Sequence, residues 1–202
     1  MRVVLATSNK GKINEIQTWL NSLDTPLVWE AVAYDQLCPP FEIEETGKTF
    51  QENAYIKAQA VFDALGGKEI VLADDSGISI ESLGGAPGIY SARFSGENST
   101  DQKNIEKVVA LLREKGVTTS SAYYTAAMAL VFPEGKASVH GWMYGDVIVT
   151  PKGDKGFGYD PIFIPEGHTL TLGELDDEIK LRLSHRTQAL QRCAKVIVWG
   201  LW

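Results

Sequence analysis

Cysteines and long apolar runs are both scarce in this sequence. Its 202 residues include only two cysteines, Cys38 and Cys193, and neither lies in a CxxC or Cys/His pattern. This scarcity excludes a disulfide framework and a cysteine-based zinc site, and it favours two free thiols in a reducing cytosol. The apolar runs are far shorter than a membrane span, and the run at residues 3–6 is too short for a signal peptide. We therefore expect a soluble, cytoplasmic protein.

Basic residues are also in deficit, because 19 Lys and Arg face 26 Asp and Glu, which gives a formal net charge of -7. That balance argues against a general DNA or RNA binder but leaves room for a small anionic ligand in a locally basic cleft. The length fits one large domain or a single two-lobed unit. Predicted strands and helices alternate early in the chain, and a predicted β-hairpin follows at residues 122–149. This order favours a mixed sheet with helices on its faces, in the α/β or α+β class.

Two adjacent acids, Asp74 and Asp75, follow an apolar run at residues 70–73 that predicts a short buried strand. Gly77 predicts a turn directly after them. Burying two neighbouring charges without partners is costly, so the pair suggests a hard cation or a proton-transfer role. The alternative is a turn whose acids are solvated.

Residues 7–12 (TSNKGK) lie between a predicted strand and a predicted helix start, where free amides and the helix dipole favour a phosphate. The alternative is a solvated loop that caps the helix. Glu45 precedes the next predicted helix, at residues 49–65, and together with Asp75 it suits Mg²⁺, which prefers one or two carboxylates plus waters and phosphate oxygens. Lys57 in that helix is either a ligand contact or a solvated lysine.

Two aromatics and an acid, Phe157, Tyr159 and Asp160, share a glycine-rich loop at residues 156–161. Rings in a mobile loop suit stacking on a planar base, whereas the alternative is a loop that its rings pin to the core. His185 and Arg186 begin the last predicted helix, where cations oppose the dipole, and this local conflict favours a ligand role.

Six segments together resemble the inosine triphosphate pyrophosphatase family, also called XTP/dITP diphosphatases. They are TSNKGK (7–12), EETGKTFQENAYIKA (44–58), ADDSG (73–77), LGGAPGIYSARFSG (83–96), GFGYDPIF (156–163) and SHR (184–186), and they run in order over nearly the whole chain. The resemblance implies an elongated, mixed, twisted α/β sheet with flanking helices and two lobes around a central cleft. It implies one such domain over residues 1–202, usually as a homodimer.

The resemblance also implies the reaction: Mg²⁺-assisted attack of water at the α-phosphorus of ITP, dITP or XTP, which yields the monophosphate and pyrophosphate and cleans the nucleotide pool. Glu45 and Asp75 would hold the metal, and Asp75 would also be the base that activates water. Asp74 and Arg93 are candidates to support the contacting residues without touching the substrate themselves. For Arg93 two alternatives remain, pairing with a phosphate or pairing with an acid such as Asp74. The substrate contacts implied by motif are Thr7, Ser8, Asn9, Lys10, Gly11, Lys12, Lys57, Ser76, Phe157, Gly158, Tyr159, Asp160, Lys180, His185 and Arg186.

Base choice follows from hydrogen-bond chemistry, because Lys180 and Arg186 are obligate donors. They suit the oxygen at position 6 of hypoxanthine and xanthine and leave the adenine amine facing donors. Two alternatives remain open at this stage. One is a Maf-like pyrophosphatase with another base preference, and the other is a catalytically silent nucleotide sensor.

Overall fold

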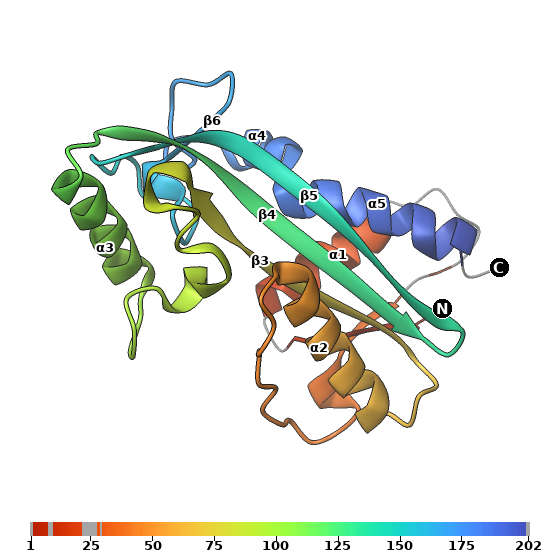
Figure 1. Ribbon diagram of the computed structural model, residues 1–202. Coiled ribbons are helices and arrows are strands. Elements are labelled where there is room, and N and C mark those ends of the chain that lie inside the picture. Colours follow the sequence, from red (N-terminus) through yellow and green to blue (C-terminus); the bar gives the residue numbers. More distant parts are fainter. Residues whose placement is uncertain (1, 8–9, 22–27, 29, 201–202) are drawn as a thin grey trace. The chain divides into compact units, whose positions relative to one another are not determined.

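The chain forms a mixed α/β structure around one six-stranded sheet (Figure 1). The computed structural model describes residues 2–7, 10–21, 28 and 30–200. The strands are β1 (Arg2–Leu5), β2 (Glu30–Ala33), β3 (Ile70–Ile80), β4 (Thr119–Phe132), β5 (Gly135–Ile148) and β6 (Phe163–Pro165). The α-helices are α1 (Lys10–Asn21), α2 (Phe50–Ala64), α3 (Asp101–Glu114), α4 (Asp177–Leu183) and α5 (His185–Gly200).

The strands are ordered β2-β1-β3-β4-β5-β6. Strand β1 pairs in parallel with both β2 and β3, whereas β5 and β6 pair antiparallel. The sheet is therefore mixed, and the predicted fold class is confirmed.

The chain divides into two compact units, one made of residues 1–75, 127–140 and 189–202 and the other of residues 76–126 and 141–188. Strands β3, β4 and β5 each contribute residues to both units. The single two-lobed domain over residues 1–202 stays a prediction.

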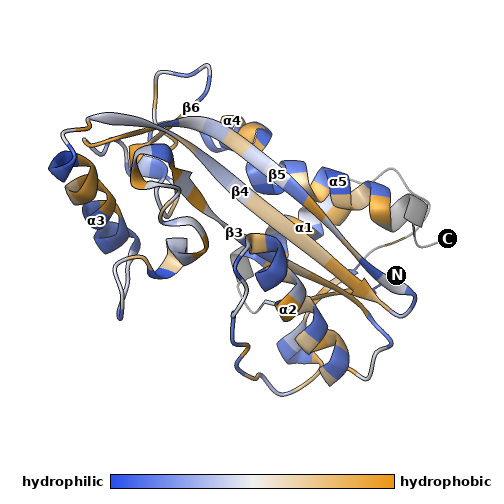
Figure 2. Ribbon diagram, in the orientation of Figure 1, coloured by the Kyte–Doolittle hydropathy of each residue, from blue (hydrophilic) through white to orange (hydrophobic). Residues whose placement is uncertain are grey.

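In the first unit, α2 packs on one face of the sheet. Its Ala54, Ala58 and Val61 are fully buried in a cluster that includes Val71 and Ala73 of β3. Thr49 caps the helix, because its side chain accepts a hydrogen bond from Glu52 N. Figure 2 shows that β4 is apolar toward its C-terminal end, and Ala127, Ala129 and Val131 of that stretch belong to the same cluster.

In the second unit, α3 buries an apolar stripe of Ile105, Val108 and Leu112 beside Ile78 and Ile80 of β3. The cap of this helix is Thr100, whose hydroxyl accepts from Lys103 N at 3.2 Å. The pattern Ser99-x-x-Gln102 predicts a capping box that starts at Ser99. That prediction is wrong by one residue, since the Ser99 hydroxyl donates instead to Gly96 O.

Strand β3 is longer than expected. The sequence predicted a strand over residues 70–73 with a turn at Gly77, but β3 continues to Ile80. The two acids lie inside the strand because each has a cationic partner, which offsets the cost of placing charge there. Adjacent side chains of a strand point to opposite faces, so Asp75 lies on the face of Val71 and Ala73 and Asp74 lies on the other.

Candidate active site

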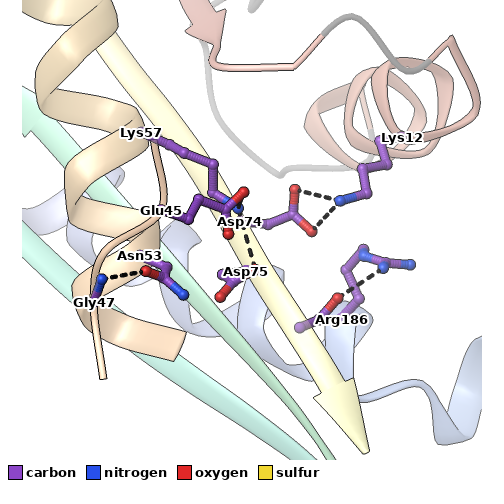
Figure 3. Close-up of polar contacts among 9 residues, drawn as sticks. Lys12, Glu45, Gly47, Asn53, Lys57, Asp74, Asp75 and Arg186 are labelled. Carbon is purple, nitrogen blue, oxygen red and sulfur yellow. Dashed lines mark hydrogen bonds and ion pairs between the residues drawn. The ribbon is translucent and has the colours of Figure 1, made fainter. Parts of the chain in front are cut away.

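Asp75 and Glu45 converge on one ammonium group, that of Lys57. Lys57 Nζ lies 3.2 Å from Asp75 Oδ1 and 3.4 Å from Glu45 Oε1 (Figure 3). Asp75 comes from β3, Lys57 from α2 and Glu45 from the segment that leads into α2. All three lie in the first unit, and the structure thus brings the two predicted metal ligands to a single point.

One oxygen of this carboxylate pair is left unsatisfied. Asp75 Oδ2 is buried and makes no hydrogen bond within the protein. Buried polar atoms almost always have a partner, so an orphaned carboxylate oxygen calls for an explanation outside the packing of the fold.

Asn53 is oriented toward the same carboxylate by the turn that precedes α2. Its Oδ1 accepts from Gly47 N at 2.8 Å (Figure 3). The amide nitrogen Nδ2 makes no hydrogen bond of ordinary geometry, yet its proximity lowers the pKa of Asp75. Only glycine fits at position 47, because a Cβ there would lie 2.6 Å from Asn53 Oδ1.

The net pKa of Asp75 is raised above the ordinary value for an aspartate. Burial is the main cause, and the nearby charge of Glu45 adds to it, while Lys57 opposes both. A carboxylate with a raised pKa and a buried, unbonded oxygen is suited to take a proton or to bind a cation.

The donor set at this point fits a hard divalent cation. Two carboxylates, one with an unsatisfied oxygen, match the one or two protein ligands that Mg²⁺ usually takes. Among the described residues no group of three or more His, Cys, Asp or Glu side chains gathers as a cation site. The fit is therefore to an ion whose remaining ligands are waters and substrate oxygens.

Asp74 is engaged on the opposite face of β3. Both of its carboxylate oxygens accept from Lys12 Nζ of α1, at 3.0 and 2.8 Å (Figure 3). The structure thus connects one predicted phosphate-binding residue, Lys12, to one predicted supporting residue. Thr7 precedes α1, whereas Lys10 and Gly11 are its first two residues. The predicted contacts Ser8 and Asn9 lie outside the described residues.

The second unit holds the remaining predicted contacts. Arg186 at the start of α5 is buried, and its Nη2 lies 3.3 Å from Ser76 Oγ. Ser184 caps this helix, because its hydroxyl accepts from the amides of Arg186 and Thr187 at 3.2 and 3.3 Å. The His185 ring stacks on Tyr124, with 4.9 Å between ring centroids. The cap compensates in part for placing two cationic residue types at a helix N-terminus.

The loop at residues 156–160 divides its aromatic residues between two environments. Phe157 is 69% exposed, whereas Tyr159 is buried and donates its hydroxyl to Ser91 O at 2.7 Å. The alternative of a loop pinned to the core thus describes Tyr159, whereas stacking of Phe157 on a base stays a prediction. Tyr159 pins the loop to the core, and Phe157 is displayed to solvent.

Asp160 is the buried acid of that loop, and its Oδ2 lies 3.3 Å from Phe157 N. Burial raises its pKa to about 6, against the opposing effects of the hydrogen bond from Phe157 N and the charges of Lys180 and Arg186. Lys180, which also pairs with Asp177 at 3.1 Å, approaches Gly156 closely. A Cβ at position 156 would lie 2.0 Å from Asp160 Oδ2, and φ there is +85°, so glycine is required.

Arg93 contacts an aromatic ring, and its pairing with a phosphate or an acid stays a prediction. Its guanidinium lies over the Tyr90 ring, 5.3 Å from the centroid.

A cavity of about 430 Å³ in the second unit is lined by Ile80, Gly84, Tyr123 and Tyr144, among others, and by none of the predicted site residues.

Neither Asn53 nor Asp101 was assigned a site role from the sequence, although both contact predicted site segments. Asn53 and Lys57 are four residues apart, and this spacing places both on one face of α2. This spacing is visible in the sequence and could have indicated Asn53 as a neighbour of Lys57. Asp101 Oδ2 accepts from Gly158 N at 2.6 Å across 57 residues of sequence, and no local pattern indicates such a contact.

The comparisons with known proteins agree with one another. The model of the Ham1 family matches residues 3–196. A protein of Nautilia profundicola named dITP/XTP pyrophosphatase is 50% identical over 191 residues, covering 95% of this chain and 94% of its own. A protein of Sulfurimonas denitrificans with the same name is 49% identical over 206 residues and covers all of both chains.

Solved structures give the same result. The Ham1 protein of Staphylococcus aureus superposes with a TM-score of 0.88 at 34% identity over 100% of both chains. A HAM1 protein of Coxiella burnetii gives a TM-score of 0.89 at 37% identity over 98% of both chains. Within the described part of the chain, none of the helices combines the length and apolar character that crossing a bilayer requires.

Proposed function

The chain belongs to the Ham1 family, and from this premise we propose that it hydrolyses dITP, ITP and XTP to the monophosphate and pyrophosphate. Two relatives that cover 95% and 100% of this chain, at 50% and 49% identity, carry the name dITP/XTP pyrophosphatase. The role would be to remove deaminated purine nucleotides from the pool before polymerases use them.

The observation that carries the proposal is the state of Asp75. One of its oxygens is held by Lys57, and the other is buried and unbonded. That second oxygen is suited to accept a proton from an attacking water, and the raised pKa of the carboxyl makes it a better base than an ordinary aspartate. Attack at the α-phosphorus then expels pyrophosphate. No covalent nucleophile is required, and Cys193 is buried with its pKa raised to about 12.

We further propose that Glu45 and Asp75 hold Mg²⁺, since their carboxylates converge on one point. When bound, the ion would neutralise charge on the triphosphate and on the departing pyrophosphate. The chain's own cations act in the same sense. Lys57 is the nearest, and Lys12 and the residues from Thr7 to Gly11 form the predicted triphosphate contacts.

Base recognition is proposed for the second unit. Lys180 and Arg186 present donors that suit the oxygen at position 6 of a deaminated purine. The exposed ring of Phe157 offers a stacking surface for the base. Ser76, Gly158, Tyr159, Asp160 and His185 complete the predicted contacts. Sites built on such hydrogen bonds can reject the wrong partner by roughly 10⁴-fold or more.

The test is pyrophosphate release with Mg²⁺ from ITP, dITP, XTP, GTP, ATP and dTTP in parallel. We expect strong release from the first three substrates and little from the rest, and loss of release when EDTA removes the metal. Release mainly from dTTP would contradict the base preference. Activity that persists in EDTA would contradict the metal assignment.

We propose a homodimer that works in the cytoplasm on free nucleotides and does not bind nucleic acid polymers. The acidic net charge of -7 argues against binding of nucleic acid polymers, and the free thiols of Cys38 and Cys193 fit a reducing cytoplasm. Light scattering coupled to gel filtration tests the dimer, and a mass of one chain would contradict it.

A further inference from the structure

We propose that Asp101 is a positioning residue for nucleobase binding, which it serves by clamping the loop that displays Phe157. This inference rests on the proposed function. Asp101 Oδ2 accepts from Gly158 N at 2.6 Å, and Asp160 Oδ2 lies 3.3 Å from Phe157 N. Two carboxylates thus hold two consecutive backbone amides, and the exposed ring lies on the first of them.

The clamp is built on a rigid base. Asp101 is the first residue of α3, where the helix dipole also stabilises a carboxylate. Four residues further on, Ile105 belongs to the core of the second unit. A side chain at the start of a well-packed helix is held more firmly than one on a free loop, so its hydrogen bond constrains the loop.

The same helix secures the loop at a second point. Tyr159 donates to Ser91 O, and Asn104 of α3 donates to that same carbonyl at 3.3 Å. Ser91 Oγ in turn accepts from Ile78 N of β3 at 2.9 Å. Gly158 and Tyr159 are therefore both tied to α3, one directly through Asp101 and the other through the Ser91 carbonyl.

The clamp matters because Gly158 is the most adaptable residue of the loop. Its φ is +60°, and a Cβ built there meets no atom within 4 Å, so neither sterics nor packing restrains it. Without the Asp101 contact, the backbone next to Phe157 gains freedom that base binding must then remove. The entropy cost of ordering this backbone weakens substrate binding more than it slows the chemical step, which depends on Asp75.

The experiment compares three variants of the full-length protein. Asp101→Ala removes the acceptor, and Asp101→Asn keeps an acceptor oxygen but no charge. Thr100→Ala removes the helix cap without touching the loop and serves as the matched control for lost helix stability. Each is measured for KM and kcat with ITP and for amide hydrogen exchange of the peptide that contains residues 156–160.

We expect Asp101→Ala to raise KM by about threefold to tenfold, the range of one lost hydrogen bond, with little change in kcat. Exchange in the loop peptide should become faster. Asp101→Asn should restore most of the affinity, and Thr100→Ala should leave both KM and loop exchange near wild type. A charge effect on the anionic substrate would instead lower KM in both Asp101 variants.

Two failures are distinguishable. A wild-type protein that releases no pyrophosphate from ITP would overturn the proposed function and, with it, the role in base binding. An active wild type whose KM and loop exchange are unchanged in Asp101→Ala would overturn this inference alone. Equal effects of Thr100→Ala and Asp101→Ala would also overturn it, because they would trace to α3 as a whole.

Discussion

Lys57 of α2 and Asp75 of β3 form a buried ion pair that leaves one carboxylate oxygen unbonded. The pair joins Nζ and Oδ1 at 3.2 Å, and both side chains are largely buried. Lys57 lowers the pKa of Asp75, but burial and Glu45 raise it more. Lys57 thus holds one carboxylate oxygen, while the other stays available for chemistry.

Asp75→Asn should abolish pyrophosphate release while sparing the fold. The amide keeps the shape of the side chain but cannot take a proton, so we expect kcat to fall by roughly 10²- to 10⁴-fold. Burial disfavours the charge of Asp75, so loss of that charge costs the folded state little. We therefore expect the free energy of unfolding in urea to change by no more than about 1 kcal/mol. Asp63→Asn on the exposed part of α2, where the Asp63 side chain accepts from Gln59 Nε2 at 2.9 Å, is the control and should keep full activity. Unchanged turnover in Asp75→Asn would remove this residue from the mechanism.

The Lys12–Asp74 pair should contribute measurably to stability. Asp74 is almost completely buried, and both of its carboxylate oxygens accept hydrogen bonds from Lys12 Nζ. Removing the ammonium group would leave the buried carboxylate charge without this partner, which destabilises the folded state. We expect Lys12→Met to lower the free energy of unfolding by about 1–3 kcal/mol, less than for a fully buried pair because Lys12 is partly exposed.

A double-mutant cycle with Lys12→Met and Asp74→Asn isolates the pairwise energy. The matched control is the same cycle on Arg182 and Glu178, an exposed pair one turn apart in α4, for which we expect a coupling of about 0.5 kcal/mol or less. Equal couplings in the two cycles would contradict the burial argument.

Local sequence patterns predicted a helix or strand correctly where a single pattern, such as an apolar stripe or strand alternation, runs through the segment. The apolar stripe and the capping threonine of α2 are both visible in the sequence, and the helix forms at residues 50–64 as expected from 49–65. The Asp74 and Asp75 side chains also separate onto two faces, as the alternation of a strand requires. These features depend only on neighbours within about one helical turn.

The errors arose where distant partners decide. The extent of β3 beyond Ala73 was missed because the acids are paired by Lys12 and Lys57, each from another element. The Asp101 contact with Gly158 was missed for the same reason. Such contacts depend on tertiary packing, and a single sequence carries no periodicity that reports them.

Arg186→Ala should narrow the preference for ITP over ATP. The guanidinium is buried beside Ser76 and carries only donors, so it favours an oxygen at position 6 of the base. We expect the ratio of kcat/KM for ITP to that for ATP to fall by about tenfold or more. Arg192→Ala in the same helix, where Arg192 bonds the His140 carbonyl, controls for loss of an arginine and should keep the ratio. An unaltered ratio in Arg186→Ala would refute this account of base choice.

Asp160 should make the protein less stable as the pH rises toward neutrality. Its folded pKa of about 6 lies above the ordinary value of 3.8, because burial disfavours the charged form. The folded state therefore holds the proton more tightly, and this contribution to stability is complete below the unfolded pKa and lost as the pH rises through about 6. Asp160→Asn cannot titrate, so its stability relative to wild type should increase between about pH 5 and pH 7.5, by on the order of 1 kcal/mol.

Urea unfolding of both proteins at the two pH values measures this difference. Asp176→Asn provides the contrast, because Lys155 holds the pKa of Asp176 below its ordinary value and the group is therefore ionised throughout that window. The stability of Asp176→Asn relative to wild type should accordingly stay constant between the two pH values. A constant difference for Asp160→Asn as well would show that Asp160 titrates as an ordinary aspartate, and the burial argument for its raised pKa would fail.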